Sequence, residues 1–113
     1  MRVYGIKNCG SVKKALDFLE SKKIDYEFID LKKVKLDKGE LESWLKSVSL
    51  EELFNKKGTT YKKLNLKELD LNEAEIKEWL LKEQMLIKRP VIVCKKGVLV
   101  GFDLEKYAEF FNA

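Results

Sequence analysis

The chain has no histidine, and this absence excludes several kinds of active site. A serine or cysteine nucleophile activated by imidazole is impossible, which removes most hydrolase mechanisms. The two cysteines, Cys9 and Cys94, are too few for a zinc site without histidine ligands. We therefore expect no metal and no bound cofactor. Any nucleophile must be activated by a helix dipole, a lysine or an arginine.

Long hydrophobic runs are also missing. No apolar stretch approaches the roughly 20 residues of a membrane span, and the N-terminus lacks the features of a signal peptide. A length of 113 residues, with 45% hydrophobic and 37% charged residues, is typical of one globular domain. We expect a cytoplasmic monomer without a membrane contact. A reducing cytosol disfavours a disulfide between Cys9 and Cys94, and Cys94, in an apolar strand, is interpreted as core packing.

Arginine is scarce, since only Arg2 and Arg89 occur among 23 basic residues. Residues 36–83 hold nine lysines against eleven acids, whereas the rest of the chain holds 14 basic residues against eight acids. The basic excess favours an anionic ligand, such as an oxyanion, glutathione or an acidic protein face. No direct DNA binding is expected, because lysines and acids are interleaved and no recognition motif is present.

Periodicity and turn residues indicate an α/β fold. The predicted order is β-α-β, a mostly helical stretch, then β-β-α, with one mixed sheet and a helical insertion at about residues 36–83. Strands are expected at 3–6, 26–31, 91–94 and 98–101, and helices at 11–22 and 38–48. A capped turn from Ser49, a polar loop at 55–61 and a helix capped by Asn72 follow, and Lys88-Arg89-Pro90 ends that helix. Asp103 caps a last helix, whose inward residues are Leu104, Tyr107, Phe110 and Phe111.

Cys9 follows the first strand and precedes the first helix, in the run Lys7-Asn8-Cys9-Gly10-Ser11. A thiol at a helix N-terminus faces unpaired backbone N–H groups and the positive end of the helix dipole, and both favour the thiolate. Ser11 is the expected N-cap. The alternative is a half-buried structural cysteine, which is the usual role of a free cysteine. The nearby lysines favour the reactive thiol.

Four segments carry a resemblance to a known family. They are Tyr4-Gly5-Ile6-Lys7-Asn8-Cys9, the run from Asn55 to Leu64, Lys88-Arg89-Pro90, and Gly101-Phe102. In this order and spacing the chain resembles the arsenate reductase-like (ArsC/Spx) family. The resemblance implies a thioredoxin-like core at 1–34 and 86–113, with the helical insertion between the two parts. It also implies a cis peptide before Pro90, beside the nucleophilic cysteine.

The resemblance assigns roles to single residues. Cys9 matches the family's nucleophile, and Arg89 matches one of three oxyanion-binding arginines. Lys57 stands where the second would be, which keeps the charge but not the bidentate geometry. Gly101-Phe102 marks the region of the third and supplies no basic residue, and the histidine that lies four positions before the family's cysteine is replaced by Gly5.

These matches favour an enzyme with a single thiol. We expect a glutathione-linked thiol oxidoreductase, with glutathione as co-substrate and glutaredoxin as a partner, in which the backbone N–H groups of Gly10 and Ser11 also bind anions. One alternative is a regulator like Spx, which binds RNA polymerase, although Val12 stands where the Cys-x-x-Cys switch of that branch needs its second cysteine. The other is a true arsenate reductase. Lys57 can equally be a solvated loop residue, and Arg89 a surface residue beside a structural proline.

Overall fold

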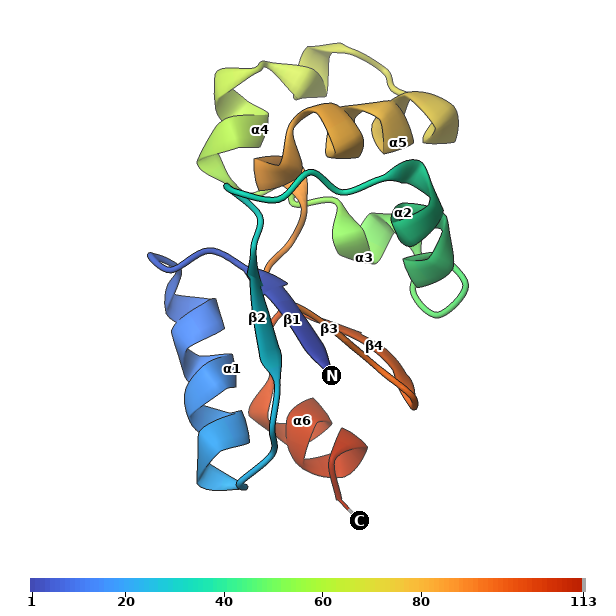
Figure 1. Cartoon of the computed structure of the whole chain (residues 1–113). Helices are drawn as coiled ribbons and strands as arrows, with labels where there is room; N and C mark the ends of the chain where they lie inside the picture. The colour runs from blue at the N-terminus through green and yellow to red at the C-terminus, as the bar shows by residue number, and fades with distance from the viewer. Residues whose placement is uncertain (113) are drawn as a thin grey trace.

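The computed structural model of the chain describes residues 1–112, which form a four-stranded mixed sheet and a set of helices (Figure 1). The first part is β1 (Arg2–Gly5), α1 (Gly10–Ser21) and β2 (Glu27–Asp30). The middle part consists of α2 (Lys38–Trp44), α3 (Leu50–Leu53), α4 (Thr59–Lys63), the 3-10 helix η1 (Leu66–Glu68), α5 (Glu73–Lys82) and the 3-10 helix η2 (Gln84–Leu86). The last part is β3 (Val91–Cys94), β4 (Gly97–Val100) and α6 (Leu104–Phe110).

The strands follow the order β2-β1-β3-β4, with β1 and β3 in the centre of the sheet. β1 runs parallel to β2, because α1 carries the chain back to the starting end of the sheet. β3 runs antiparallel to both β1 and β4, and a two-residue turn at Lys95 and Lys96 joins β3 to β4. The expected parallel pair and the expected hairpin are confirmed.

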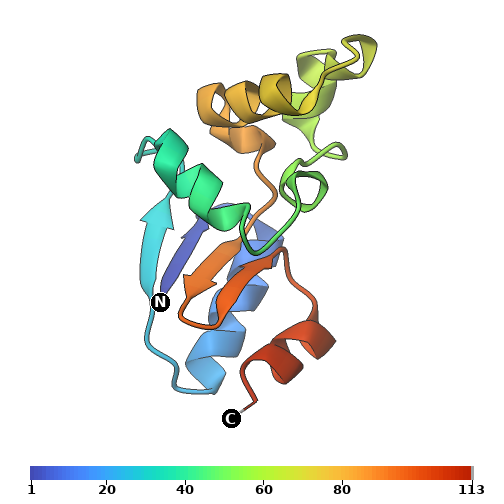
Figure 2. The ribbon, with the colours of Figure 1, turned by 90° about the vertical axis from the view of Figure 1, so that its right-hand side faces the viewer.

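Alternating residues of the central strands feed two separate hydrophobic clusters, because neighbouring side chains of a strand point to opposite faces. Val3 and Ile92 pack with α1 and with Tyr107 of α6. Tyr4 and Val91 instead pack with the helical part, in a larger cluster that includes Trp44. Figures 1 and 2 show the same division, with α1 and α6 along the sheet and the α2–α5 part gathered at one end of it.

Three local expectations about the helical part differ from the structure. The helix capped by Asn72 ends at Lys82, well before Lys88-Arg89-Pro90, and the 3-10 helix η2 follows it. The helix that begins at Lys38 ends at Trp44 rather than at Val48. The polar stretch before Tyr61 is not all loop, because α4 begins at Thr59. By contrast, the predicted caps Ser49 and Asn72 each form a reciprocal capping box, with Glu52 and Glu75 respectively.

The last helix also needs one correction. Asp103 caps α6 as expected, and its carboxylate accepts the Lys106 N–H at 3.2 Å. Leu104, however, is 61% exposed and does not face the core. It lies in the first helical turn, just beyond the cap, where the other face of α6 carries the buried Tyr107.

The order of elements and the mixed sheet give the chain a thioredoxin-like fold. All elements between β2 and β3 are helical, apart from an isolated bridge between Phe54 and Ile87. The division into a core at 1–34 and 86–113 and an insertion at about 36–83 stays a prediction as to its exact limits. None of the helices in residues 1–112 is long and apolar enough to cross a membrane.

Candidate functional site

Cys9 is the N-cap of α1, the longest helix of the described chain. Its backbone is extended (φ −114°, ψ 124°), and its carbonyl already accepts the first helical bond, from the Lys13 N–H at 3.0 Å. The prediction of Ser11 as N-cap is therefore wrong, because the helix begins at Gly10 and no side chain caps it. The correction moves the thiol two positions closer to the open N–H groups of the helix.

The surroundings of Cys9 combine burial with access. The side chain is half-buried against the larger core cluster, and the sulfur is a free thiol. Gly10 and Ser11 are both exposed. Beyond its chain neighbours and its own helix, a Cβ on Gly10 would meet no heavy atom within 4 Å, so the space over the first turn is open. A ligand can therefore reach the two N–H groups that the sequence predicted as anion donors.

Gly5 brings the start of α1 close to the end of β1. A Cβ at Gly5 would lie 2.8 Å from Cγ2 of Val12, which is closer than two carbon atoms approach without repulsion. Val12 is itself buried, with 1% of its surface exposed. The glycine therefore lets the first helical turn pack on the strand, and this contact fixes the loop that carries Cys9.

Pro90 lies at the same end of the sheet as Cys9. The Arg89–Pro90 peptide is cis, as expected. The register pairs Tyr4 with Val91, so Pro90 comes next to the end of β1, where the Cys9 loop begins. The Pro90 carbonyl accepts the Gly101 N–H at 2.8 Å, which closes the β3–β4 pair on its other side.

The Arg89 side chain is half-buried and turned towards η2. Its Nη1 donates to the Met85 carbonyl at 2.9 Å and lies 3.6 Å from the Met85 sulfur. Its Nε is buried and has no hydrogen-bond partner among residues 1–112. An unsatisfied buried donor costs about 1–3 kcal/mol, more when it is charged. Arg89 is thus held in place by one bond and keeps donor capacity for an anion.

The loop that carries Lys57 is tied to the segment before Arg89. The Asn55 N–H donates to the Leu86 carbonyl and the Lys88 N–H donates to the Leu53 carbonyl, each at 2.8 Å. The Asn55 carboxamide oxygen in turn accepts the Lys57 N–H at 3.2 Å, which bends the loop. Lys57 itself is exposed and forms no ion pair within residues 1–112.

The corner at Gly101 and Phe102 is held by packing and by one hydrogen bond. Gly101 has a positive φ of +77°, which only glycine adopts without strain. Its carbonyl accepts the Tyr107 hydroxyl, and Phe102 packs edge-on against the Tyr107 ring with centroids 4.8 Å apart. Burial raises the pKa of Tyr107, so its hydroxyl stays a neutral donor. Neither Gly101 nor Phe102 supplies the third basic group of the family pattern, but the Lys88 side chain passes close by, with its Cε 3.7 Å from where a Cβ on Gly101 would lie.

Cys94 lies at the other end of the sheet. The register pairs Arg2, the first residue of β1, with Val93, whereas Cys9 follows the last residue of β1. Cys94 is half-buried, pairs with Gly97, and is a free thiol. No group of three or more potential metal ligands occurs in the part of the chain that the structure describes.

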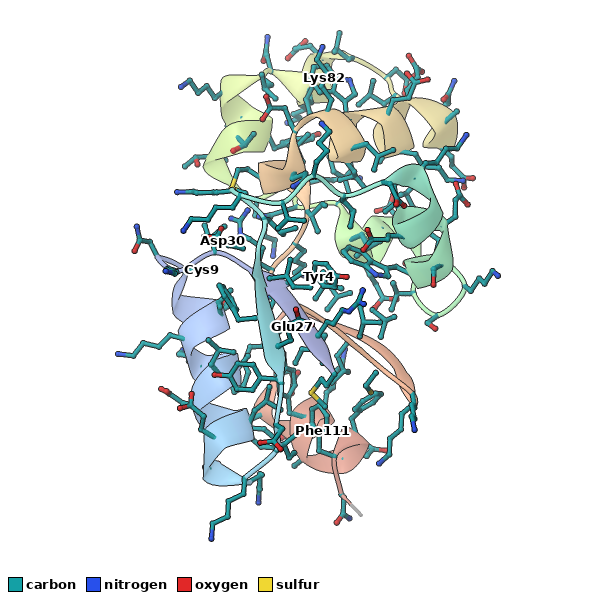
Figure 3. The ribbon with its side chains drawn as sticks, in the orientation of Figure 1. Tyr4, Cys9, Glu27, Asp30, Lys82 and Phe111 are labelled. Atoms are coloured by element: carbon teal, nitrogen blue, oxygen red, sulfur yellow. The ribbon has the colours of Figure 1, made fainter. Side chains whose placement is uncertain are left out.

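Figure 3 shows Cys9 at the top of α1, near Asp30 at the end of β2. At this end of the sheet the structure gathers Cys9, the open N–H groups of α1, and Arg89-Pro90, with the Lys57 loop bonded to the residues before Arg89. Sequence reasoning missed the role of Met85, whose carbonyl holds Arg89, and no local motif could have revealed it. The Asx turn of Asn55 had a signal, the Asn-x-x-Gly spacing before α4.

Comparisons with known proteins agree with this arrangement. An uncharacterized protein of Haemophilus influenzae is 34% identical over 110 residues, which is 96% of each chain. The global transcriptional regulator Spx 2 of Bacillus anthracis is 24% identical over 96% of this chain and 84% of its own. The solution structure of an arsenate reductase (ArsC) related protein from Brucella melitensis has a TM-score of 0.75 and 38% identity, covering 99% of this chain and 94% of its own. The ArsC family model matches residues 4–110, and the chain therefore belongs to the ArsC family.

Proposed function

We propose that the chain is a glutathione-linked thiol–disulfide oxidoreductase that uses Cys9 as its only redox-active thiol. The observation that carries this proposal is the position of Cys9 as the uncapped N-cap of α1, at the sheet end where Pro90 follows a cis peptide. An uncapped N-terminus leaves its N–H groups free to stabilise a thiolate. The residue three positions later is the buried Val12, so the second thiol must come from another molecule.

The chemistry proceeds in two exchange steps. The Cys9 thiolate attacks the glutathione sulfur of a mixed disulfide, forms a Cys9–glutathione disulfide, and releases the other partner as a thiolate, which takes a proton from water. A second glutathione thiolate then attacks the glutathione sulfur of that adduct. Cys9 is released as a thiolate, and oxidised glutathione leaves. The two electrons come from glutathione, and glutaredoxin can replace it in the second step.

Basic groups at the site bind the carboxylates of glutathione. Arg89 contributes its half-buried guanidinium, Lys57 an exposed positive charge, and Gly10 and Ser11 their backbone N–H groups. Arsenate is a poorer substrate for this set, because a fully charged oxyanion needs several donors around the attacking thiolate. The corner at Gly101 supplies no arginine, and the Lys88 beside it lacks the bidentate geometry of one. We expect arsenate reduction with glutathione and glutaredoxin to be weak.

The test is glutathione-dependent turnover with the mixed disulfide of glutathione and 2-mercaptoethanol. Wild type and Cys94→Ser should turn over, and mass spectrometry of the stopped reaction should place glutathione on Cys9. Cys9→Ser should be inactive. Glutathione found on Cys94, or turnover that survives Cys9→Ser, would refute the assignment.

A second candidate function is regulation through RNA polymerase. The Spx 2 relatives support it, because they align with 96% of this chain. Such a protein would bind the polymerase without turnover, and Cys9→Ala would still bind. A pull-down with purified RNA polymerase, together with no turnover on glutathione disulfides, would favour this second candidate.

A further inference from the structure

A cleft of about 330 Å³ opens between the loop after β2 and the end of α5. One wall is the segment from Leu31 to Lys35, and the other is the segment from Lys82 to Met85. None of the roles assigned above to Cys9, Arg89 or Lys57 uses the interior of this cleft. It therefore needs its own explanation.

The first wall is held rigidly by Gln84. The Gln84 amide nitrogen donates to the carbonyls of Leu31 and Val34, at 2.8 and 2.7 Å, and its oxygen accepts the Leu36 N–H at 2.6 Å. Asp30 adds a turn at the base, where its carboxylate accepts the Lys32 N–H at 2.9 Å. The loop is thus fixed before any partner arrives, which lowers the entropy that binding would lose.

The charged side chains that line the cleft are mainly basic. Four lysines line it, against one acid, Glu83. Within residues 1–112 none of the four forms an ion pair with a carboxylate. The lysines are Lys32, Lys33, Lys35 and Lys82.

These lysines differ in what they already contact. Lys35 donates to the Leu81 carbonyl at 2.9 Å, and Lys82 lies over the Trp79 ring, 5.2 Å from its centroid. Lys32 and Lys33 are exposed, and Val34 beside them is 44% exposed. Exposed lysines beside an exposed apolar side chain can meet a complementary acidic surface on another protein.

The cleft adjoins the Cys9 site. Leu31 and Met85 line it; Leu31 belongs to the larger core cluster, and Met85 packs against that cluster, as Cys9 does. The Leu31 N–H donates to the Gly5 carbonyl at the end of β1, and the Met85 carbonyl holds Arg89. Figure 3 shows Asp30, at the base of the loop, close to the Cys9 end of α1.

We propose that this cleft docks the acidic face of a partner protein, namely the thiol protein that reduces the Cys9–glutathione disulfide. This inference rests on the proposed function of Cys9. In the step concerned, the partner's thiolate attacks the glutathione sulfur, Cys9 leaves as a thiolate, and the glutathione stays on the partner. The lysines steer an acidic partner and orient its thiol towards Cys9, as complementary charges do at other interfaces.

The experiment compares a charge reversal in the cleft with the same reversal elsewhere. Lys32→Glu/Lys33→Glu changes the cleft, and Lys95→Glu/Lys96→Glu changes the exposed turn at the far end of the sheet by the same charge. Each protein is first loaded with glutathione on Cys9. Reduction is then followed with a glutaredoxin of net negative charge and, separately, with uncharged dithiothreitol.

The cleft variant should be reduced by glutaredoxin at least about tenfold more slowly at low salt, and added salt should shrink the difference. Dithiothreitol should reduce all three proteins within about twofold of one another. An equal loss with dithiothreitol, an equal loss in the far-end variant, or no loss at all would overturn the proposal.

Direct binding separates this proposal from the proposed function. If the wild-type protein takes up no glutathione on Cys9 and shows no glutathione-dependent turnover, the proposed function fails, and calorimetry with the same glutaredoxin still decides the docking surface. Weaker binding to the cleft variant alone supports it, and equal binding or none overturns it. Tripolyphosphate that saturates the cleft without displacing glutaredoxin would show a small-anion site instead and would also overturn it.

Discussion

The two cysteines sit at opposite ends of one sheet, and only one of them has the surroundings that the proposed thiol chemistry needs. Cys9 follows the end of β1 and caps a 12-residue helix, whereas Cys94 ends β3 and pairs with Gly97 in a hairpin. Both are half-buried and free. Burial therefore does not distinguish them, but only Cys9 caps a helix, and the half-buried Arg89 lies at its end of the sheet.

The largest effect should appear when each of the two thiols is replaced in turn. Cys9→Ser should lower glutathione-dependent turnover on the order of 10³-fold or more, because the covalent step is lost. Cys94→Ser should leave it within about twofold and cost only a little stability, since serine is of similar size. Steady-state rates and urea unfolding of both variants measure this. Similar losses in the two variants would break the comparison.

The two arginines extend the same comparison. Arg89 is half-buried at the Cys9 end, while the Arg2 side chain is 58% exposed and lies 4.0 Å from Glu27 at the other end. Arg89→Ala should lower kcat/KM for glutathione roughly 10–100-fold, the scale of a hydrogen bond to a charged group. Arg2→Ala should change it less than twofold, because an exposed ion pair contributes little.

Arg89→Lys sharpens that prediction. It retains the charge but loses the planar fork and the buried Nε–H, so it should recover only part of the activity. Full recovery would mean that charge alone matters at this position. An unchanged kcat/KM in Arg89→Ala would show that glutathione does not use the side chain.

Two glycines at the Cys9 end test how the thiol is positioned. Gly5→Ala should lower the free energy of unfolding by about 1–3 kcal/mol, because its Cβ would lie 2.8 Å from Val12. It should also slow alkylation of Cys9, since the start of α1 must shift. Gly10→Ala, which meets open space, should be neutral or slightly stabilising. Denaturant unfolding and iodoacetamide kinetics on both variants check this.

Much of this arrangement could be predicted from the sequence, because it depends on local patterns. Period-two apolar runs located the strands, and the Ser49 and Asn72 caps marked helix starts through their own side chains. The start of α4 could not be predicted, because the run of lysine, glycine and threonine before it has no apolar periodicity. The N-cap of α1 was misplaced because the backbone, and not a hydroxyl, sets that boundary.

The contacts that position the site are long-range and have no sequence signal. Gln84 fixes the loop after β2 through bonds to residues about 50 positions away, and Met85 holds Arg89 through a backbone carbonyl. Every residue has a backbone carbonyl, so the residue type at position 85 does not reveal this role. Such bonds can be predicted only when the sheet register and the placement of η2 are known.

The smallest effect concerns Tyr107, whose hydroxyl donates to the Gly101 carbonyl at the Cys9 end of the sheet. Tyr107→Phe should cost about 1–2 kcal/mol at pH 7, because the Gly101 carbonyl loses its donor while the ring still fills the core. Burial raises the Tyr107 pKa, so above about pH 10 the unfolded state gives up this proton before the folded state does. The unfolded state then binds fewer protons, and the wild-type free energy of unfolding falls as the pH rises through that range. Phenylalanine lacks this proton, so urea titrations at pH 7, 9 and 10.5 should show the gap between the two proteins narrowing only at the highest pH. A gap that stays constant, or one that widens, would mean that the Tyr107 hydroxyl is not a buried neutral donor.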